Sequence, residues 1–244
     1  MEKSFAKPIY KRILLKLSGE ALQNDQHFGI DIKKLNSIVT EIKGATELGV
    51  QVAVVIGAGN LIRGADFCAE GFDRVTADQM GMLATIVNGL ALRDSLNQND
   101  IPATMLSALG VSSIAEQYDR SHAIDRLNEG KVVVLAGGTG NPLVTTDSAA
   151  ALRAIEINAD IVIKATKVDG VYSADPLKNK DAKQYTRLGY DEILANQLTV
   201  MDLNSILLCK EHDLPLRVFN MNKKNALRNI MLGENIGTLI TASV

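Results

Sequence analysis

A loop that contains three glycines, 137–140, lies between a run of five apolar residues, 132–136, and an alanine-rich segment. A short uninterrupted apolar run is typical of a parallel strand that is buried on both faces. After the loop, Thr145, Thr146 and Asp147 place hydroxyl and carboxylate groups at the capping positions of a helix. Unpaired N–H groups and the positive end of the helix dipole then face the loop. The segment therefore predicts an anion site for a nucleotide phosphate; a tight turn without a ligand is the alternative.

Short apolar runs alternate with longer amphipathic segments along the chain. Strands are predicted at 13–17, 50–56, 102–106, 132–136, 160–165, 216–219 and 238–240. Helices are predicted at 32–48, 76–96, 113–127, 145–158, 190–195 and 199–212, with a short one before the last strand. This alternation predicts an α/β fold with a mostly parallel sheet that is covered on both faces. Because no repeat or linker interrupts the pattern, residues 1–244 are expected to form a single domain.

The composition is that of a globular protein, with 46% hydrophobic and 22% charged residues. A net charge of −2 argues against a general nucleic-acid binder, which usually has a basic face. Cys68 and Cys209 form neither a disulfide framework nor a metal-ligand spacing, as is usual in a reducing cytosol. The N-terminal apolar run is broken at Lys16, so no signal peptide is expected, and no apolar run approaches the roughly 20 residues of a membrane span. We therefore expect a soluble, cytoplasmic protein without nucleic-acid or membrane partners.

Small, polar and basic residues follow four of the predicted strands. The four segments, 16–19, 57–60, 137–140 and 164–167, contain glycines, lysines and hydroxyl side chains. In an open α/β sheet, ligands bind beyond the carboxyl ends of the strands. Phosphates need N–H donors and cations around them, so these segments together predict a phosphate site at one edge of the sheet.

Two common nucleotide-binding motifs are not matched. The G-x-x-x-x-G-K-[ST] pattern of P-loop enzymes is absent. The dinucleotide fingerprint G-x-G-x-x-G lacks its third glycine in both candidate segments, 57–62 and 138–143. Asp78 follows Gly59 at about the spacing of a ribose-binding acid, but it lies at the start of a helix and not at the end of a strand. A nicotinamide-dependent enzyme is therefore disfavoured.

Several charged residues beside these loops are candidates for phosphoryl transfer. Lys16, at the end of a strand, can supply a fixed cation for the transferred group; a lysine that merely extends to solvent is the alternative. Arg63 can bind a phosphate through two parallel hydrogen bonds, or it can lie free on the surface. Asp147 and Asp202 stand at helix starts, where a role as helix caps would also explain them.

Six segments carry motifs that are recognisable together: KRILLKLSGEA (11–21), NLIRG (60–64), GGTGNP (137–142), TTDSAA (145–150), KATKVDGVY (164–172) and RVFN (217–220). They resemble the bacterial UMP kinases of the amino acid kinase superfamily, and the resemblance extends from about residue 7 to about residue 241. It implies a three-layer αβα sandwich assembled as a homohexamer. It also implies transfer of the ATP γ-phosphoryl group to UMP with Mg²⁺, which gives UDP for pyrimidine nucleotide synthesis.

The resemblance implies roles for individual residues. Lys16, Asp147 and Asp202 are expected to be catalytic, with the two acids orienting the active-site lysines and magnesium. The expected ATP contacts are Lys16, Leu17, Ser18, Gly19, Gly59, Arg63, Thr166, Tyr172 and Asp175. The expected UMP contacts are Ala58, Arg63, Asp78, Thr139, Gly140, Asn141, Pro142, Leu143, Val144, Thr145 and Thr146. Mg²⁺ is expected to be carried by the ATP phosphates and not by protein ligands.

The chain departs from the family pattern at a few positions. Ala58 replaces a glycine that is frequent in the family, and its methyl group requires a negative φ. Many members are activated by GTP and inhibited by UTP. Basic side chains that contact GTP in some members correspond to Asn97, Thr104 and Lys131, of which only Lys131 is basic here. The sequence therefore leaves GTP activation open.

Two other functions are compatible with these residues. Another amino acid kinase, of the carbamate or acetylglutamate type, phosphorylates a carbamate or carboxylate and does not need nucleoside contacts from Asp78 and Thr139. A non-catalytic nucleotide or oxyanion binder on the same fold, as in molybdenum storage proteins, does not need Lys16, Asp147 and Asp202 together.

Overall fold

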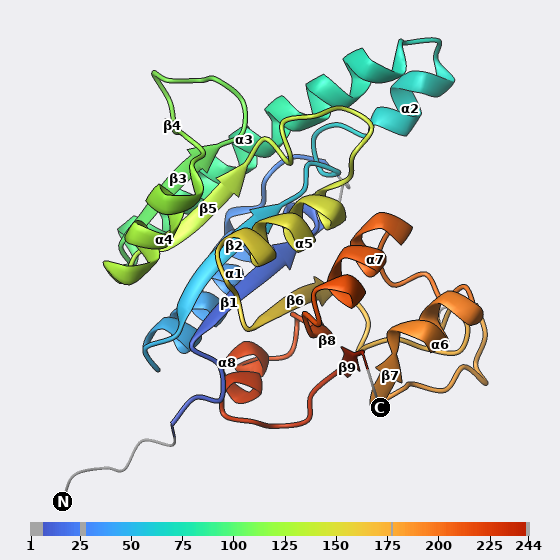
Figure 1. Ribbon diagram of the computed structural model, residues 1–244. Helices are drawn as coiled ribbons and strands as arrows, with labels where there is room; N and C mark the ends of the chain where they lie inside the picture. Colours follow the sequence, from blue (N-terminus) through green and yellow to red (C-terminus); the bar gives the residue numbers. More distant parts are fainter. Residues whose placement is uncertain (1–6, 25–27, 177, 243–244) are drawn as a thin grey trace, which may run out of the picture.

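One twisted sheet contains the strands of the described chain, which comprises residues 7–24, 28–176 and 178–242 of the computed structural model (Figure 1). The strands are β1 (Arg12–Leu17), β2 (Gln51–Ile56), β3 (Ala103–Ser107), β4 (Glu116–Gln117), β5 (Val132–Ala136), β6 (Ile161–Thr166), β7 (Arg187–Gly189), β8 (Leu216–Asn220) and β9 (Thr238–Thr241). Their spatial order is β4-β3-β5-β2-β1-β6-β8-β9-β7. Each neighbouring pair is parallel except β8 and β9. The predicted mostly parallel sheet is confirmed.

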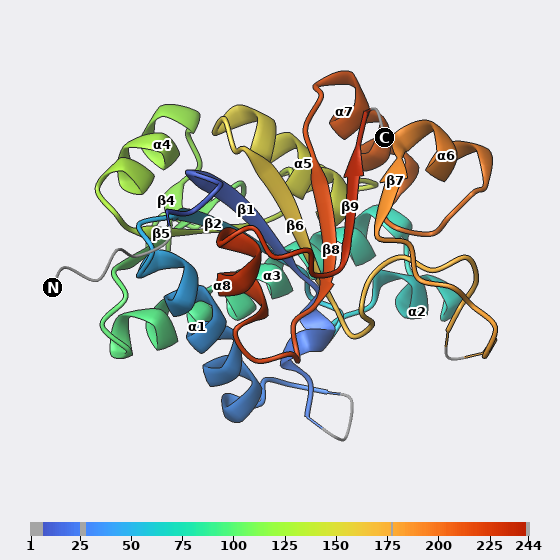
Figure 2. The same cartoon turned by 90° about the horizontal axis from the view of Figure 1, so that it is seen from below.

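Helices cover both faces of this sheet (Figure 2). The helices are α1 (Ile32–Thr46), α2 (Gly64–Ala69), α3 (Arg74–Gln98), α4 (Arg120–Asn128), α5 (Thr146–Glu156), α6 (Tyr190–Ala195), α7 (Leu203–Glu211) and α8 (Ala226–Met231), with a 3₁₀ turn, η1 (Gly19–Leu22), after β1. One core joins the sheet to α1, α3 and α8, and a second core joins its other face to α4, α5, α6 and α7. The three layers are those of an αβα sandwich.

The side-chain alternation of the strands decides which residues face each core. In β1, Ile13, Leu15 and Leu17 are fully buried toward α1 and α8, whereas Leu14 is fully buried toward α5. Burial of each such side chain contributes about 1.5–3 kcal/mol to folding. Lys16 shares the face of Leu14, because successive residues of a strand point to opposite faces. The strand therefore directs one lysine toward the N-terminal end of α5.

Helix and strand boundaries differ from the predictions where capping residues or short elements decide them. The predicted helix at 113–127 is wrong in its first part, which contains turns and β4 before α4 begins at Arg120. Asp119 sets this start, because its carboxylate accepts a hydrogen bond from the His122 N–H at 3.0 Å. Similarly, α7 begins at Leu203 and not at 199, because Asp202 caps it. The sequence did not predict α2, β4 or β7, which have six, two and three residues and are too short to show a periodic pattern.

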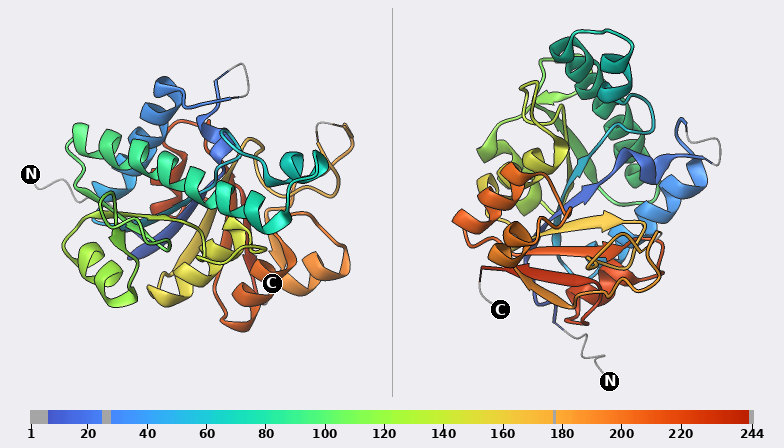
Figure 3. Two further views of the ribbon diagram at one scale, coloured as in Figure 1. Left: turned by 90° about the horizontal axis from the view of Figure 1, so that it is seen from above. Right: turned by 90° about the vertical axis from the view of Figure 1, so that its right-hand side faces the viewer.

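The long helix α3 lies along one side of the sheet and extends past its carboxyl edge (Figure 3). Two of its apolar side chains, Leu83 and Val87, are exposed and lie one turn apart on the same face of the helix. Within the described residues, no helix, α3 included, meets the length and apolarity that a membrane span requires.

Candidate functional site

The loops after β5, β2, β1 and β6 meet at one edge of the sheet, as the sequence predicts, because these four strands are adjacent. The loops after β1 and β2 touch each other at Gly19. A Cβ atom at Gly19 would lie 2.6 Å from the Gly59 nitrogen and 2.7 Å from the Gly57 carbonyl oxygen. Side-chain carbons do not approach backbone atoms this closely, so glycine is required for this contact.

Two lysines and one aspartate form a buried ionic group at this edge. The Lys16 Nζ lies 2.6 Å from Asp147 Oδ1, and the Lys164 Nζ lies 2.7 Å from Asp147 Oδ2. The exposed fractions of the three side chains are 8%, 16% and 15% for Lys16, Lys164 and Asp147. Two ammonium groups and one carboxylate leave one net positive charge in a region where water screens it poorly. Such a charge attracts phosphate oxygens.

Register explains why these residues meet. Lys16 and Lys164 are direct neighbours across the parallel pair of β1 and β6, so both side chains point to the face that α5 covers. Thr145 is the N-cap of α5, and its hydroxyl accepts hydrogen bonds from the Asp147 and Ser148 N–H groups at 3.1 and 3.2 Å. The alternative that Asp147 serves only as the helix cap is wrong, because Thr145 is the cap. Asp147 lies inside the first turn, and its side chain reaches the lysines instead.

Burial and the neighbouring charges shift the pKa values of Asp147 and Lys164, and both values are lowered. Burial alone would raise the pKa of the Asp147 carboxyl, but the charges of Lys16 and Lys164 outweigh it and lower this pKa below its usual value. For the Lys164 ammonium, burial lowers the pKa, Asp147 opposes this shift, and the charge of Lys16 adds to it. The carboxylate therefore stays ionised between the lysines at neutral pH.

Asp202 connects the N-terminal ends of α5 and α7. As the N-cap of α7, its carboxylate accepts a hydrogen bond from the Ser205 N–H at 2.9 Å. It also accepts hydrogen bonds from the Thr145 hydroxyl and, at 2.8 Å, from the Ser148 hydroxyl. Burial raises the pKa of Asp202, but these hydrogen bonds outweigh it and lower the pKa overall. The interpretation as a cap is confirmed, and the same side chain also fixes the start of α5.

A cavity of about 560 Å³ opens beside Lys164. Its lining includes Thr166, Tyr172 and Asp175, three of the residues expected to contact ATP. Val200 also lines it, and the Val200 carbonyl oxygen accepts a hydrogen bond from Lys164 Nζ at 2.7 Å. The cavity is large enough for a nucleoside and ends next to the buried positive charge.

The other residues expected to contact ATP differ in their exposure and in their partners. The Ser18 hydroxyl accepts a hydrogen bond from the Glu20 N–H at 3.3 Å, which begins η1. The Leu17 side chain is fully buried in the core, so only its backbone can reach a ligand. Arg63 is half exposed and forms an ion pair with Glu20 at 2.7 Å. Lys167 pairs with the other oxygen of Glu20 at 3.3 Å. Glu20 thus lies between two cations at the mouth of the site.

The loop expected to bind UMP is fixed by Asp78 of α3. The Asp78 carboxylate accepts a hydrogen bond from the Leu143 N–H at 2.8 Å, and Arg74 donates to both of its oxygens at 3.0 Å. The backbone of Leu143 has a φ of +67°, which is uncommon for a residue other than glycine. Ala58 is not among the described residues with positive φ, so the condition for its methyl group is met. Contact of Asp78 with a ribose stays a prediction.

The rest of this loop remains open to solvent. Thr139 donates a hydrogen bond from its hydroxyl to the Asn141 carbonyl and accepts one from the Asn141 N–H, at 3.4 and 3.2 Å. Gly140 adopts a φ of +89°, and Val144 is exposed. Pro142 and Thr146 complete the turn into α5. The expected UMP contacts at 139–146 thus form one continuous segment that leads into α5, whereas Ala58, Arg63 and Asp78 lie on other segments.

Two residues of the site are not singled out by the sequence. In the sequence, Glu20 and Lys164 are recognised only as parts of the longer motifs 11–21 and 164–172. A detectable signal exists for Lys164, because it interrupts an apolar strand in the same way as Lys16. Glu20 has no such signal, because an exposed glutamate after a glycine is common.

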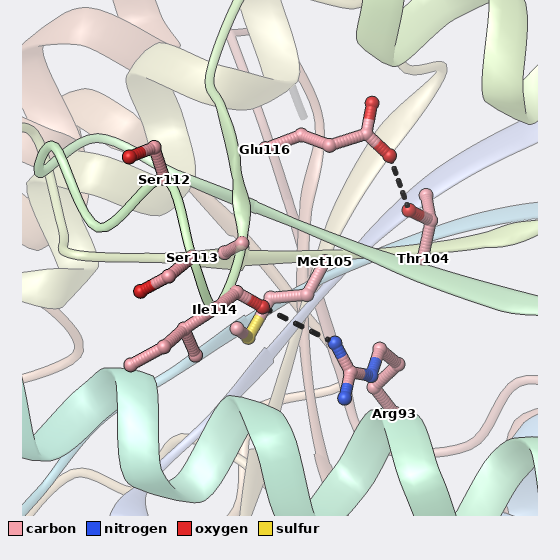
Figure 4. A pocket seen from close by; sticks show the side chains of 8 residues that line it. Arg93, Thr104, Met105, Ser112, Ser113, Ile114 and Glu116 are labelled. Atoms are coloured by element: carbon pink, nitrogen blue, oxygen red, sulfur yellow. Dashed lines mark hydrogen bonds between the residues drawn. The ribbon is translucent and has the colours of Figure 1, made fainter.

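A smaller cavity, of about 210 Å³, lies between α3 and β3 at the far side of the sheet (Figure 4). Arg93 and Thr104 line it, and the Thr104 hydroxyl donates a hydrogen bond to Glu116 at 3.5 Å. Asn97 exchanges two hydrogen bonds with the backbone of β3, at 2.9 and 3.2 Å. Lys131 pairs with a glutamate of the turn after α4 at 2.9 Å. Of the three positions that the resemblance links to GTP, only Thr104 lines the cavity.

Comparisons with known proteins agree on one family. The sequence model of the amino acid kinase family matches residues 11–220. A uridylate kinase of Pseudomonas paraeruginosa is 57% identical over 237 residues, which cover 97% of this chain and 97% of that protein. One from Yersinia enterocolitica is 56% identical over 239 residues, or 98% and 96% of the two chains. The crystal structure of a UMP kinase from Bacillus anthracis matches with a TM-score of 0.94 at 40% identity, covering 96% of this chain and 97% of that one. The chain therefore belongs to the amino acid kinase family, in its branch of uridylate kinases.

Proposed function

We propose that this chain is a UMP kinase that transfers the γ-phosphoryl group of ATP to UMP and releases ADP and UDP. The observation that carries the proposal is the buried group of Lys16, Asp147 and Lys164, which lies between a nucleoside-sized cavity and a glycine loop. A kinase needs these three parts, a donor pocket, an acceptor loop and a fixed positive charge between them. The uridylate kinases among its relatives support UMP as the acceptor.

The transfer needs no general base on the protein. An oxygen of the UMP phosphate, already an anion, bonds to the γ-phosphorus while the bond from that phosphorus to the β–γ bridging oxygen breaks. The electron pair of the broken bond stays on ADP. Lys16 and Lys164 neutralise the charge that develops on the transferred oxygens, and Asp147 keeps both ammonium groups in position. The positive end of the α5 dipole acts in the same direction.

Mg²⁺ enters our proposal with the ATP phosphates, where it supplies charge neutralisation. The donor set supports this arrangement. Both oxygens of Asp147 face lysines, and the Asp202 oxygens accept hydrogen bonds from Thr145, Ser148 and Ser205. In the described part of the chain, no group of three or more His, Cys, Asp or Glu side chains is arranged to hold a metal ion. Asp147 and Asp202 would then act on the metal only through the groups that they orient.

A coupled assay of ADP release from ATP with UMP tests the proposed function directly. We expect turnover with UMP that depends on added Mg²⁺. Turnover with CMP and not with UMP would show that the base pocket was misassigned. Activity only with carbamate or acetylglutamate would favour another kinase of the family, and binding without turnover would favour a non-catalytic protein. The same assay with added GTP and UTP measures activation and inhibition by these nucleotides.

Replacing Arg63 with alanine is expected to weaken UMP binding by about 10- to 100-fold, the effect of losing a charge-assisted hydrogen bond to phosphate. The change also removes one of the two cationic partners of Glu20 and leaves Lys167 as the other. Calorimetric titration with UMP measures the effect. Arg187→Ala, an exposed arginine of the edge strand β7, is the matched control and should bind UMP as the unchanged protein does. Unchanged UMP affinity in Arg63→Ala would remove Arg63 from the phosphate site.

We further propose a cytoplasmic enzyme of pyrimidine nucleotide synthesis that assembles as a homo-oligomer, a hexamer by analogy with the family. The exposed apolar side chains Leu83 and Val87 on α3, 52% and 49% exposed, support a subunit contact there. Light scattering coupled to size-exclusion chromatography measures the assembly. A monomer at micromolar concentration would contradict this part of the proposal.

A further inference from the structure

The helix α3 carries two buried polar side chains that point at the site and that the phosphoryl transfer does not use. Thr85 is 2% exposed and Asn88 is fully buried. They lie three residues apart on a helix, so they share one face. Polar groups this deep in a protein are retained only where they satisfy hydrogen bonds. Their partners are the two glycine loops of the site.

Thr85 fixes the start of the acceptor loop. Its hydroxyl accepts a hydrogen bond from the Gly137 N–H at 2.8 Å and donates one to the Met82 carbonyl at 2.7 Å. Only a hydroxyl side chain can do both at this position, because it has one donor and two acceptor sites. Gly137 has a φ of +76°, and a Cβ there would lie 3.1 Å from the Leu109 nitrogen. The loop is therefore confined between α3 and the segment after β3.

Asn88 fixes the neighbouring loop to the same helix. Its amide donates to the Gly57 carbonyl at 2.8 Å. It also exchanges two hydrogen bonds with the Asn60 amide, at 2.7 and 3.0 Å, and Asn60 in turn donates to the Gly29 carbonyl at 2.9 Å. Thr85 and Asn88 thus attach the loops after β5 and β2 to one rigid element.

Close packing of α3 on the sheet makes both contacts possible. Gly89 faces β3 and β5, and a Cβ there would lie 2.8 Å from the Met105 sulfur and 3.4 Å from the Ala136 Cβ. Ala136 is the last residue of β5, directly before Gly137. Without a side chain at Gly89, the helix lies near enough for Thr85, one turn earlier, to reach the Gly137 N–H.

We propose that Thr85 is a positioning residue for the acceptor. Its hydroxyl sets the place of the 137–140 loop relative to the 57–60 loop, which Asn88 holds on the same helix. The inference rests on the proposed UMP kinase function, because it assigns the 137–140 loop to UMP. Transfer between two bound nucleotides depends on the placement of the acceptor oxygen to within a fraction of an ångström. Movement of this loop should therefore weaken UMP binding and slow the transfer, while the protein stays folded.

Two variants of Thr85 separate its hydroxyl from its shape. Thr85→Val keeps the volume and removes the hydroxyl, whereas Thr85→Ser keeps the hydroxyl and removes a methyl group. For Thr85→Val we expect kcat/KM for UMP to fall about tenfold or more, with KM for ATP changed less than about twofold. Thr85→Ser should retain most of the kcat/KM for UMP of the unchanged protein. Thr40→Val, at an exposed threonine of α1, is the control for the substitution itself.

A second measurement does not depend on activity. Hydrogen exchange of the ligand-free protein should be faster at the amides of 137–140 in Thr85→Val and unchanged in Thr85→Ser. If the unchanged protein turns over no UMP, the proposed function fails while the exchange result still decides the role of Thr85. Equal kinetics in the valine and serine variants, or a lower melting temperature with unchanged kcat/KM and unchanged exchange at 137–140, would overturn the inference.

Discussion

Replacing Lys16 with alanine is expected to lower kcat for UMP phosphorylation by about 10²–10³-fold, while KM for ATP and UMP changes less than about threefold. Lys16 is 8% exposed and pairs with Asp147 at 2.6 Å, so in the proposed site water cannot replace its charge. A cation at this position stabilises the transferred phosphoryl group more strongly in the transition state than in the bound substrates. Steady-state kinetics with each substrate varied in turn measures the two parameters.

Lys16→Met is the companion variant, because it keeps the length of the side chain and removes only the charge. The two variants should have similar kcat values if the charge is responsible. Both should remain folded, since Asp147 keeps Lys164 as its partner at 2.7 Å and the remaining pair is neutral. Equal losses in kcat and in substrate affinity would mean that Lys16 also binds the substrates in the ground state, which contradicts a role confined to the transition state. A normal kcat in Lys16→Met would assign the alanine effect to lost packing.

The place of the site could be predicted from the sequence because it depends on local patterns. Apolar runs that end in glycine and lysine identify strand ends, and parallel strands bring their ends to one edge. These patterns alone predict that Lys16 and the loop 137–140 share an edge of the sheet, and both lie there. The predicted helix start at 32 is likewise confirmed, because Asp31 caps α1 and its carboxylate accepts the Lys33 N–H at 2.7 Å.

Long-range register could not be predicted, and it decides the chemistry. Nothing in the chain indicates that β6 lies beside β1 with Lys164 opposite Lys16. The strands β2 to β5 intervene in sequence, and all of them lie on the other side of β1. Without that neighbour, Asp147 resembles an ordinary residue of a helix start. Thr85 could not be predicted for a related reason: a threonine inside an apolar helix carries no signal, and only the approach of Gly137 gives it a partner.

Replacing Asp147 with asparagine is expected to destabilise the fold, in contrast to the loss of Lys16. The variant leaves two ammonium groups side by side at low exposure with no carboxylate between them. Removal of one partner from a buried ionic group costs about 3–5 kcal/mol of unfolding free energy. For a chain of this length, that corresponds to a fall in melting temperature of about 6–20 °C. Urea unfolding gives the free energy, and Asp125→Asn, at an exposed position of α4, is the control.

The pH dependence gives this prediction its distinct signature. The pKa of the Asp147 carboxyl is lower in the folded protein than in the unfolded chain, where it is about 3.9. Its contribution to the free energy of unfolding is therefore fully present above the unfolded-state pKa and is lost as pH falls through the folded-state pKa. The pKa of Lys164 is also lowered, so its charge costs stability at neutral pH and this cost decreases as pH rises through the folded value. Loss of Asp147 removes an interaction that raises the Lys164 pKa, so the stability of Asp147→Asn should recover at alkaline pH. In acid, the variant should not show the loss of stability that protonation of Asp147 causes in the unchanged protein.

The double variant Lys16→Met with Asp147→Asn tests whether charge balance is the cause. It leaves Lys164 as the single charge of the original three. We therefore expect it to be more stable than Asp147→Asn alone, although it has one more substitution in the core. Both should be inactive as kinases, since each lacks part of the group that positions the phosphoryl oxygens. A double variant that is less stable than Asp147→Asn would show that packing around Lys16, and not repulsion between Lys16 and Lys164, determines the cost.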